Sequence, residues 1–153
     1  RYIPDKDIAE DILQDSFIKI FSSIGSFKSK GEGAFKAWIS RITVNEALMY
    51  LRKQKRCNFI EFQDHLPDIP EDAEPDIGNI PAAEIQKMIQ SLSDGYRTIF
   101  NLVALEGKSH KEVAELLGIT ESTSASQFHR ARKILAKKIT DYNKRNDAGT
   151  ARK

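Results

Sequence analysis

Side chains that can bind nucleic acid recur at helical spacing between residues 41 and 56. Steps of four, three and four residues place them on one helical edge, which continues one turn further: Arg41, Asn45, Leu48, Arg52 and then Arg56. Arginine can neutralise a phosphate, asparagine can offer a donor and an acceptor to an unstacked base, and an exposed aromatic ring such as that of Trp38 can stack on it. On this helix alone, the commoner interpretation is a solvated face with Trp38 in the core.

The second half of the chain carries a pattern typical of a helix-turn-helix. Ser109 and Glu112 form a capping box that starts a helix. A small residue, a glycine that permits a tight turn, an apolar residue and a cap for the next helix follow in order: Ala114, Gly118, Ile119 and Thr120. That next helix carries a basic run: His129, Arg130, Arg132, Lys133, Lys137 and Lys138. The pattern predicts a helix that enters the DNA major groove, and an antiparallel helical pair with a charged face remains the alternative.

Residues suited to enzymatic or metal chemistry lack the spacing that such chemistry needs. Cys57 is interpreted as an ordinary thiol, and the three histidines have no metal-ligand spacing. The sequence has no nucleophile elbow or phosphate-binding glycine loop, and the Gly-Glu-Gly of residues 31–33 is too short to count. We therefore expect no enzyme activity, no metal and no cofactor. Without an apolar run of about 18 residues or a signal segment, we expect a cytoplasmic protein with no membrane insertion.

Charge divides the chain into three segments. The net charge is +4 over residues 1–57, −7 over residues 58–83 and +5 over residues 84–153, and +2 for the whole chain. The middle segment has no lysine or arginine and holds four of the five prolines, so it is predicted to be an extended or irregular acidic linker. The 153 residues are therefore interpreted as two small domains with separate interaction surfaces.

Apolar periodicity predicts an all-α fold, with two small helical domains joined by the acidic linker. Residues 8–24 follow helical spacing, and a loop rich in Gly, Ser and Lys leads to a second helix from Ala34 to about Arg56. The predicted apolar stripe of this second helix consists of Phe35, Trp38, Ile39, Ile42 and Met49. Beyond the linker, residues 85–92 and 96–106 are predicted to form two helices before the helix-turn-helix.

Two long stretches resemble known regions of one family. "DIAEDILQDSFIKIFSSIGSFKSKGEGAFKAWISRITVNEALMYLRKQKR" resembles region 2 of bacterial sigma factors, and "LSDGYRTIFNLVALEGKSHKEVAELLGITESTSASQFHRARKIL" resembles their region 4. With only a short acidic linker between them, the chain resembles the extracytoplasmic-function (ECF) subgroup. The resemblance implies a transcription initiation factor that binds core RNA polymerase, recognises the minus-10 and minus-35 promoter elements and helps to open the DNA. It also implies an anti-sigma factor as a partner, and a linker that threads the polymerase towards its RNA exit path.

The resemblance assigns residues to each task. Residues 1–57 match region 2, 58–83 the linker and 84–140 region 4, and residues 141–153 are predicted to be a frayed tail. The implied polymerase-binding residues are Gln14, Asp15 and Lys19. Those implied for the minus-10 element are Phe27, Lys28, Lys30, Arg41, Asn45, Arg52, Lys53 and Arg56. Those implied for the minus-35 element are Ser122, Thr123, Ser126, Gln127, Arg130 and Lys133. For Trp38, core packing is preferred to stacking on DNA.

The chain also departs from the family pattern. Ser124 stands where an apolar residue usually packs against the core, and we expect its hydroxyl to bond a carbonyl one turn back. Ala125 stands where a basic residue is common, which removes one phosphate contact. Family members usually have a further helix before Tyr2, so the region 2 core is expected to be incomplete. A conventional helix-turn-helix regulator and a sigma-mimicking interaction protein are the alternative functions.

Overall fold

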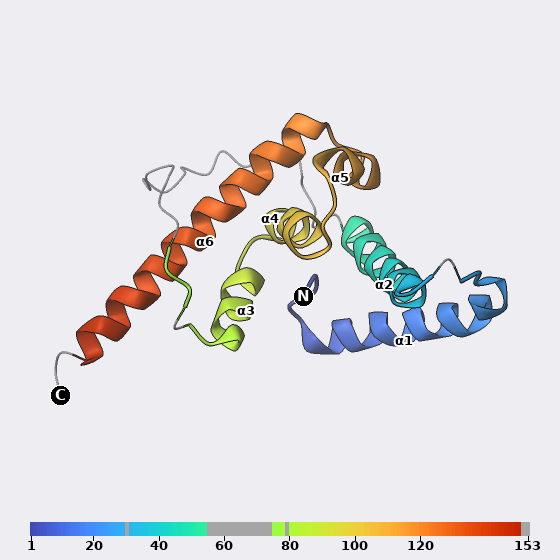
Figure 1. Cartoon of the computed structure of the whole chain (residues 1–153), viewed down its shortest axis with the longest axis horizontal. Helices are drawn as coiled ribbons and strands as arrows, with labels where there is room; N and C mark the ends of the chain where they lie inside the picture. Colours follow the sequence, from blue (N-terminus) through green and yellow to red (C-terminus); the bar gives the residue numbers. More distant parts are fainter. Residues whose placement is uncertain (30, 55–74, 79, 151–153) are drawn as a thin grey trace. The chain divides into compact units, whose positions relative to one another are not determined.

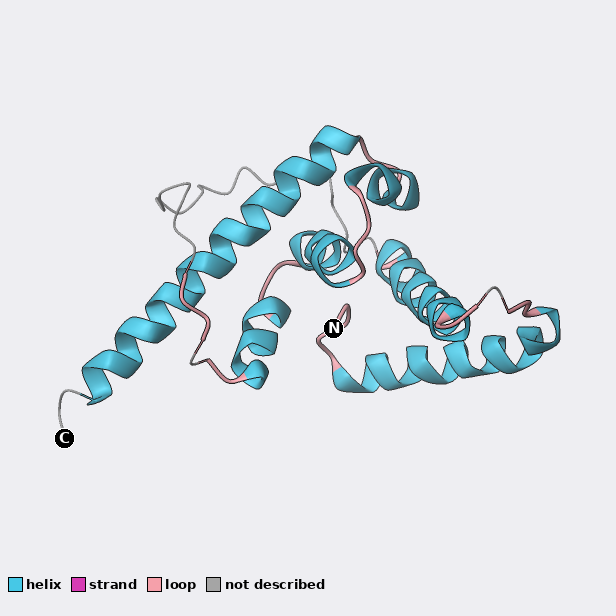
Figure 2. Ribbon diagram, in the orientation of Figure 1, coloured by secondary structure: helices cyan, strands magenta, loops and turns pink. Residues whose placement is uncertain are grey.

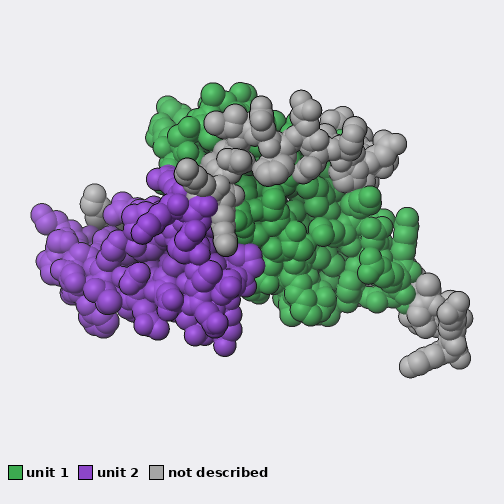
Figure 3. Space-filling model, turned by 180° about the vertical axis from the view of Figure 1, so that it is seen from behind, with its two compact units in different colours: residues 1, 58–153 green, residues 2–57 purple. Residues whose placement is uncertain are grey.

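The computed structural model describes residues 1–29, 31–54, 75–78 and 80–150. Within these residues every regular element is helical (Figure 1, Figure 2), which confirms the predicted all-α fold. The chain divides into two compact units, one of residues 2–57 and one of residues 1 and 58–153 (Figure 3). None of the helices in the described part is long and apolar enough to cross a membrane.

The unit of residues 2–57 is built on two helices that pack side by side (Figure 1). α1 (Lys6–Ser23) begins after Asp5, whose Oδ1 accepts a hydrogen bond of 3.1 Å from a backbone amide of the first turn. A 3-10 turn (Ile24–Ser26) and a loop lead to α2 (Ala34–Lys53). Gly33 precedes α2 with φ of 76°, a left-handed conformation that glycine adopts without steric cost.

The buried side of α2 differs from the predicted apolar stripe. Its fully buried side chains are Val44, Ala47, Leu48 and Leu51. Phe35 and Met49, which the sequence predicts to be core, are 46% and 53% exposed. Leu48, which the sequence places on the polar edge, is only 3% exposed. These three predictions are wrong because α2 carries apolar residues on two sides, and helical periodicity does not tell which side is buried.

The described part of the C-terminal unit contains four α-helices. They are α3 (Ala82–Gln90), α4 (Asp94–Phe100), which continues as a π-helical turn (Asn101–Leu105), α5 (His110–Leu117) and α6 (Glu121–Thr150). α6 contacts α3, α4 and α5 (Figure 1). Its core positions Ala131 and Leu135 pack with Leu92 and Tyr96. α6 continues through residues 141–150, for which the sequence predicts a frayed tail.

A buried arginine holds the corner between α3 and α4. Arg97 is 1% exposed, and its Nη1 donates to the backbone carbonyls of Gln90 at 3.1 Å and Leu92 at 2.6 Å. Its Nη2 pairs with the carboxylate of Asp94. Gln90 ends α3, where the last carbonyls of a helix have no partner within the helix. The guanidinium therefore ties the end of α3 to the first turn of α4.

α5 and α6 form the predicted helix-turn-helix. Ser109 Oγ accepts a hydrogen bond from the Glu112 amide at 3.2 Å, and Glu112 Oε2 accepts one from the Ser109 amide at 2.8 Å. The Ser109 backbone amide is the main reason why the pKa of Glu112 lies below its ordinary value. Gly118 ends α5 with φ of 69°, and Thr120 Oγ1 accepts a hydrogen bond from the Thr123 amide at 3.1 Å. The capping box, the glycine turn and the Thr120 cap are all confirmed.

Candidate nucleic-acid interface

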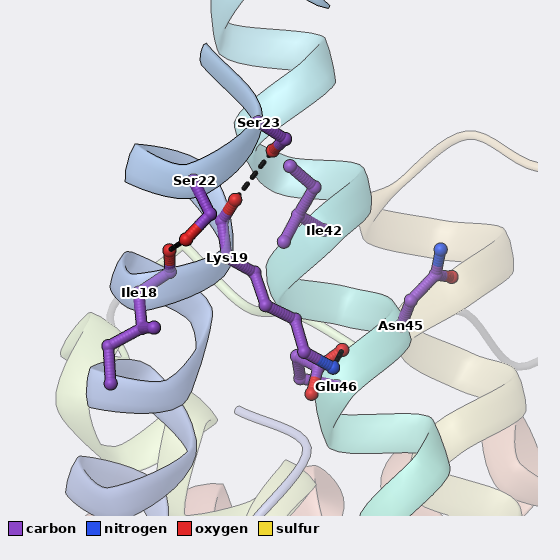
Figure 4. A pocket seen from close by; sticks show the side chains of 7 residues that line it. All are labelled: Ile18, Lys19, Ser22, Ser23, Ile42, Asn45 and Glu46. Atoms are coloured by element: carbon purple, nitrogen blue, oxygen red, sulfur yellow. Dashed lines mark hydrogen bonds and ion pairs between the residues drawn. The ribbon is translucent and has the colours of Figure 1, made fainter.

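An open groove of about 430 Å³ lies between α1 and α2 (Figure 4). α1 and α2 contribute its lining residues, which are Ile18, Lys19, Ser22, Ser23, Ile42, Asn45 and Glu46. Lys19 Nζ and Glu46 Oε1 form an ion pair of 2.7 Å across the groove, and the Asn45 amide points away from this pair (Figure 4). The hydroxyls of both serines donate to carbonyls one turn back, so their oxygens can only accept further hydrogen bonds.

The three polymerase-binding candidates on α1 are all exposed, and two of them share one face. Asp15 and Lys19 are four residues apart and lie on the same face, where Lys19 pairs with Glu46, whereas Gln14 points about 100° away from Asp15 around the helix. Beside Gln14, α1 carries a stripe of exposed apolar side chains, Leu13, Phe17, Ile18, Phe21 and Ile24. Exposed apolar surface of this kind marks interaction sites. Sequence reasoning missed this stripe, although the apolar residues on two sides of α1 were a signal for it.

Three aromatic rings meet where the interhelical loop joins α2. The ring centroid of Phe27 lies 5.4 Å from that of Phe35 and 5.2 Å from that of Trp38, and the Phe35 and Trp38 centroids lie 6.1 Å apart. Phe35 is exposed, and the other two rings are half-buried. We call these three residues the aromatic cluster. Trp38 is thus only half-buried and one of its two ring partners, Phe35, is exposed, so the structure does not place it fully in the predicted core.

The other minus-10 candidates within the described residues are exposed polar side chains: Lys28, Arg41, Asn45, Arg52 and Lys53. Lys30 and Arg56 lie outside the described residues. Lysine and arginine can neutralise phosphates, and an asparagine amide can pair with a base edge. The region from the loop to the end of α2 thus combines charge, hydrogen-bonding groups and flat rings. Among the described side chains, no group of three or more His, Cys, Asp or Glu could hold a metal ion.

The minus-35 candidates on α6 differ in how far their side chains are exposed. Ser122 and Ser126 are exposed, and Thr123, Arg130 and Lys133 are partly exposed. Gln127 is 4% exposed, so its assignment to DNA contact is wrong. The buried residues of this helix recur every three or four positions, as Ser124, Gln127, Ala131 and Leu135. The opposite side also carries His129 and Lys137, which belong to the basic run but are missing from the candidates.

A polar contact joins the two helices of the helix-turn-helix. Ser124 is buried, and its Oγ lies 3.0 Å from Nδ1 of His110, the first residue of α5. The ring of His110 also meets Phe128 edge-on at 5.6 Å, and Phe128 stacks on Phe100 at 5.9 Å. The sequence predicts a backbone partner for Ser124 within its own helix. The structure gives it a side-chain partner on α5, which links the orientations of the two helices.

Comparisons with known families match both units. The model described as Sigma-70 region 2 covers residues 1–57, and the model described as Sigma-70, region 4 covers residues 82–135. The ECF RNA polymerase sigma-E factor of Haemophilus influenzae is 33% identical over 156 residues, which cover 91% of this chain and 78% of that protein. The chain belongs to the ECF sigma factors.

Further relatives of this ECF sigma factor are also sigma factors. The RNA polymerase sigma-H factor of Pseudomonas aeruginosa is 28% identical over 150 residues, which cover 91% of this chain and 77% of that protein. The sigma factor RpoE of Bartonella quintana, crystallised with the anti-sigma factor NepR, matches with a TM-score of 0.54 and 26% identity over 89% of this chain and 83% of that one. The chain is therefore a transcription initiation factor that directs core RNA polymerase to promoter DNA, in a family whose members are not enzymes.

Proposed function

We propose that the loop and α2 bind the melted minus-10 element, with the aromatic cluster as a stacking platform and Asn45 as a residue that recognises a base. The observation that carries this proposal is the exposure of the Phe35 ring, which packs with the half-buried rings of Phe27 and Trp38. Stacking of an unpaired base on an aromatic side chain contributes about 1–3 kcal/mol. The exposed lysines and arginines on the same elements supply phosphate contacts, which hold the separated strand without recognising its sequence.

The test is open-complex formation with core polymerase on a promoter that carries a fluorescent base analogue in the minus-10 element. Phe35→Ala should reduce open-complex formation about tenfold, the effect of about 1.4 kcal/mol of lost stacking. Ala37→Ser, an uncharged change at a nearby exposed position of α2, is the matched control. If Phe35→Ala opens the promoter as well as the wild type does, the aromatic cluster is not the stacking platform.

The exposed side of α6 is the proposed contact with the minus-35 element. Ser122 and Ser126 are short and must lie deep in the major groove, whereas Arg130 can reach a guanine edge or a phosphate. Arg130→Ala should cost about 1–3 kcal/mol in promoter binding, and Lys144→Ala, further along the helix, should cost less. A loss confined to one base position indicates direct recognition, and a uniform loss with weaker salt dependence indicates a phosphate contact. No loss of binding would refute the assignment of this face.

The apolar stripe on α1, together with Gln14, is the proposed contact with core polymerase. Phe21 is 73% exposed, and burying such a side chain in a partner contributes about 1.5–3 kcal/mol. Phe21→Ser should therefore weaken the binding of core polymerase by at least tenfold without loss of helix content. Asp11→Ser, at another exposed position of α1, is the control. Equal affinities of the two variants would show that polymerase binds elsewhere.

An anti-sigma factor is the further partner that we propose, because the RpoE relative was crystallised with one. Such a protein would prevent transcription by competing with core polymerase for this chain in the cytoplasm. The experiment is a competition in which the candidate protein displaces core polymerase from the immobilised chain.

DNA binding without polymerase tests the alternative function. Binding of duplex promoter DNA at full affinity in the absence of polymerase would favour a conventional regulator over a sigma factor.

A further inference from the structure

The end of the linker lies against the part of α6 that follows Lys138. Asn143 Nδ2 donates a hydrogen bond of 2.8 Å to the backbone carbonyl of Asp76, 67 residues earlier in the chain. Ile80 and Ile139, which belong to these two segments, are 8% and 9% exposed. The described end of the linker thus contacts residue 143, in the stretch for which the sequence predicts a frayed tail.

The same stretch of linker is also folded on itself. Asp76 Oδ1 accepts a hydrogen bond from the Gly78 amide at 2.8 Å, and the Ile80 amide donates to the Ile77 carbonyl at 3.2 Å. Pro81 then leads directly into α3, since its carbonyl accepts the first backbone hydrogen bonds of that helix. The described residues from Asp76 to Pro81 are therefore held by turn hydrogen bonds, by α6 and by the start of α3. A linker that only connects two units requires none of these contacts.

We propose that the part of α6 after Lys138 anchors the linker, and that Asn143 is a positioning residue that sets where the linker leaves the C-terminal unit. The consequence for promoter recognition rests on the proposed function of the two units. Release of residues 75–81 would lengthen the free linker by about 3.3–3.6 Å per residue, or about 24 Å at full extension. DNA rises about 3.4 Å per base pair, so this length corresponds to at most about seven base pairs. The anchor therefore narrows the range of spacings between the two promoter elements.

Hydrogen exchange on the full chain tests the anchor itself. Asn143→Ala removes the side-chain donor at a helical position where alanine is favourable, so α6 is retained. The amides of Gly78 and Ile80 should exchange about 2- to 10-fold faster, as expected for the loss of one intramolecular hydrogen bond. The matched control is Lys144→Ala, the next residue of α6, which should leave this exchange unchanged. Ile80→Ala is a second variant and should accelerate exchange of the same segment through lost apolar contact.

Run-off transcription with core polymerase tests the consequence. The quantity measured is transcription from a promoter with the optimal spacer relative to promoters whose spacers differ from it by up to three base pairs. This preference for the optimal spacer should fall about threefold or more in Asn143→Ala. If the exchange rates of Gly78 and Ile80 are unchanged in both Asn143→Ala and Ile80→Ala, the proposed anchor is wrong. If exchange is faster but the preference for the optimal spacer is unchanged, the anchor does not affect promoter spacing. A wild-type chain that initiates at no promoter would refute the proposed function instead, while the exchange measurement would still decide the anchor.

Discussion

Replacing Arg97 by methionine should destabilise the C-terminal unit by about 3 kcal/mol. The Leu92 carbonyl is buried and loses a charged donor at 2.6 Å, which costs about 1–3 kcal/mol. The Gln90 carbonyl is only partly buried, and its bond contributes about 0.5–1.5 kcal/mol. Asp94 adds little, because its side chain is 24% exposed and water can replace the guanidinium. Methionine has a similar length and restores most of the apolar contacts of the arginine stem.

Urea unfolding of the full chain can assign this loss to the correct unit. Trp38 is the single tryptophan and belongs to the unit of residues 2–57, so its fluorescence follows that unit, whereas circular dichroism follows the helices of both. We expect Arg97→Met to shift the circular dichroism transition and to leave the tryptophan transition in place. Arg97→Lys keeps the charge with a different donor geometry and should lose less. A loss below about 1 kcal/mol for Arg97→Met would refute the reasoning, because the two carbonyls would then have other donors.

Three further predictions concern single side chains. Because the pKa of Glu112 is lowered in the folded state, its contribution to stability is complete above its ordinary value of 4.5 and is lost as the pH falls through the lower folded value. Acid unfolding of Glu112→Gln should lack this component, and an unchanged acid transition would contradict it. Ser124→Ala should cost about 1 kcal/mol, and a double-mutant cycle with His110→Phe should give a coupling of about 0.5–1.5 kcal/mol, whereas zero coupling would mean that the contact contributes nothing. Trp38→Ala should cost about 2 kcal/mol, below the 3–5 kcal/mol typical of a buried aromatic, and a loss within that larger range would indicate a core position.

The elements of the helix-turn-helix could be predicted because their signals are local. The capping box joins Ser109 to Glu112 three residues away, and Gly118 and Thr120 act within one turn of their own positions. Such contacts depend on the backbone of a single helix end, so residue types and spacing are sufficient to predict them. The resemblance to the sigma family then supplied the functions of the two units.

Burial was predicted less well, because it depends on which side of a helix meets the rest of the protein. Gln127 follows Ser124 by three residues, and the sequence already places Ser124 at a core position, so helical phase alone indicated that Gln127 is buried. Phe35 and Met49 carried no comparable signal, since apolar residues occur on two sides of α2. Past Asp141, α6 is joined through Asn143 to Asp76, a contact so remote in sequence that local patterns carry no signal for it.

α6 joins the proposed DNA contact and the linker anchor in one rigid body. Ser122 and Asn143 lie on the same uninterrupted helix, about 32 Å apart at 1.5 Å per residue. A tilt of about 5° at the DNA end would move the far end by about 3 Å, which is comparable to the rise of one base pair. A small rotation at the DNA end of the helix therefore becomes a displacement of several ångströms at the linker end. Adjustment of the recognition turns to a particular minus-35 sequence would displace the start of the linker, and promoter sequence and spacer length would then affect initiation together rather than independently.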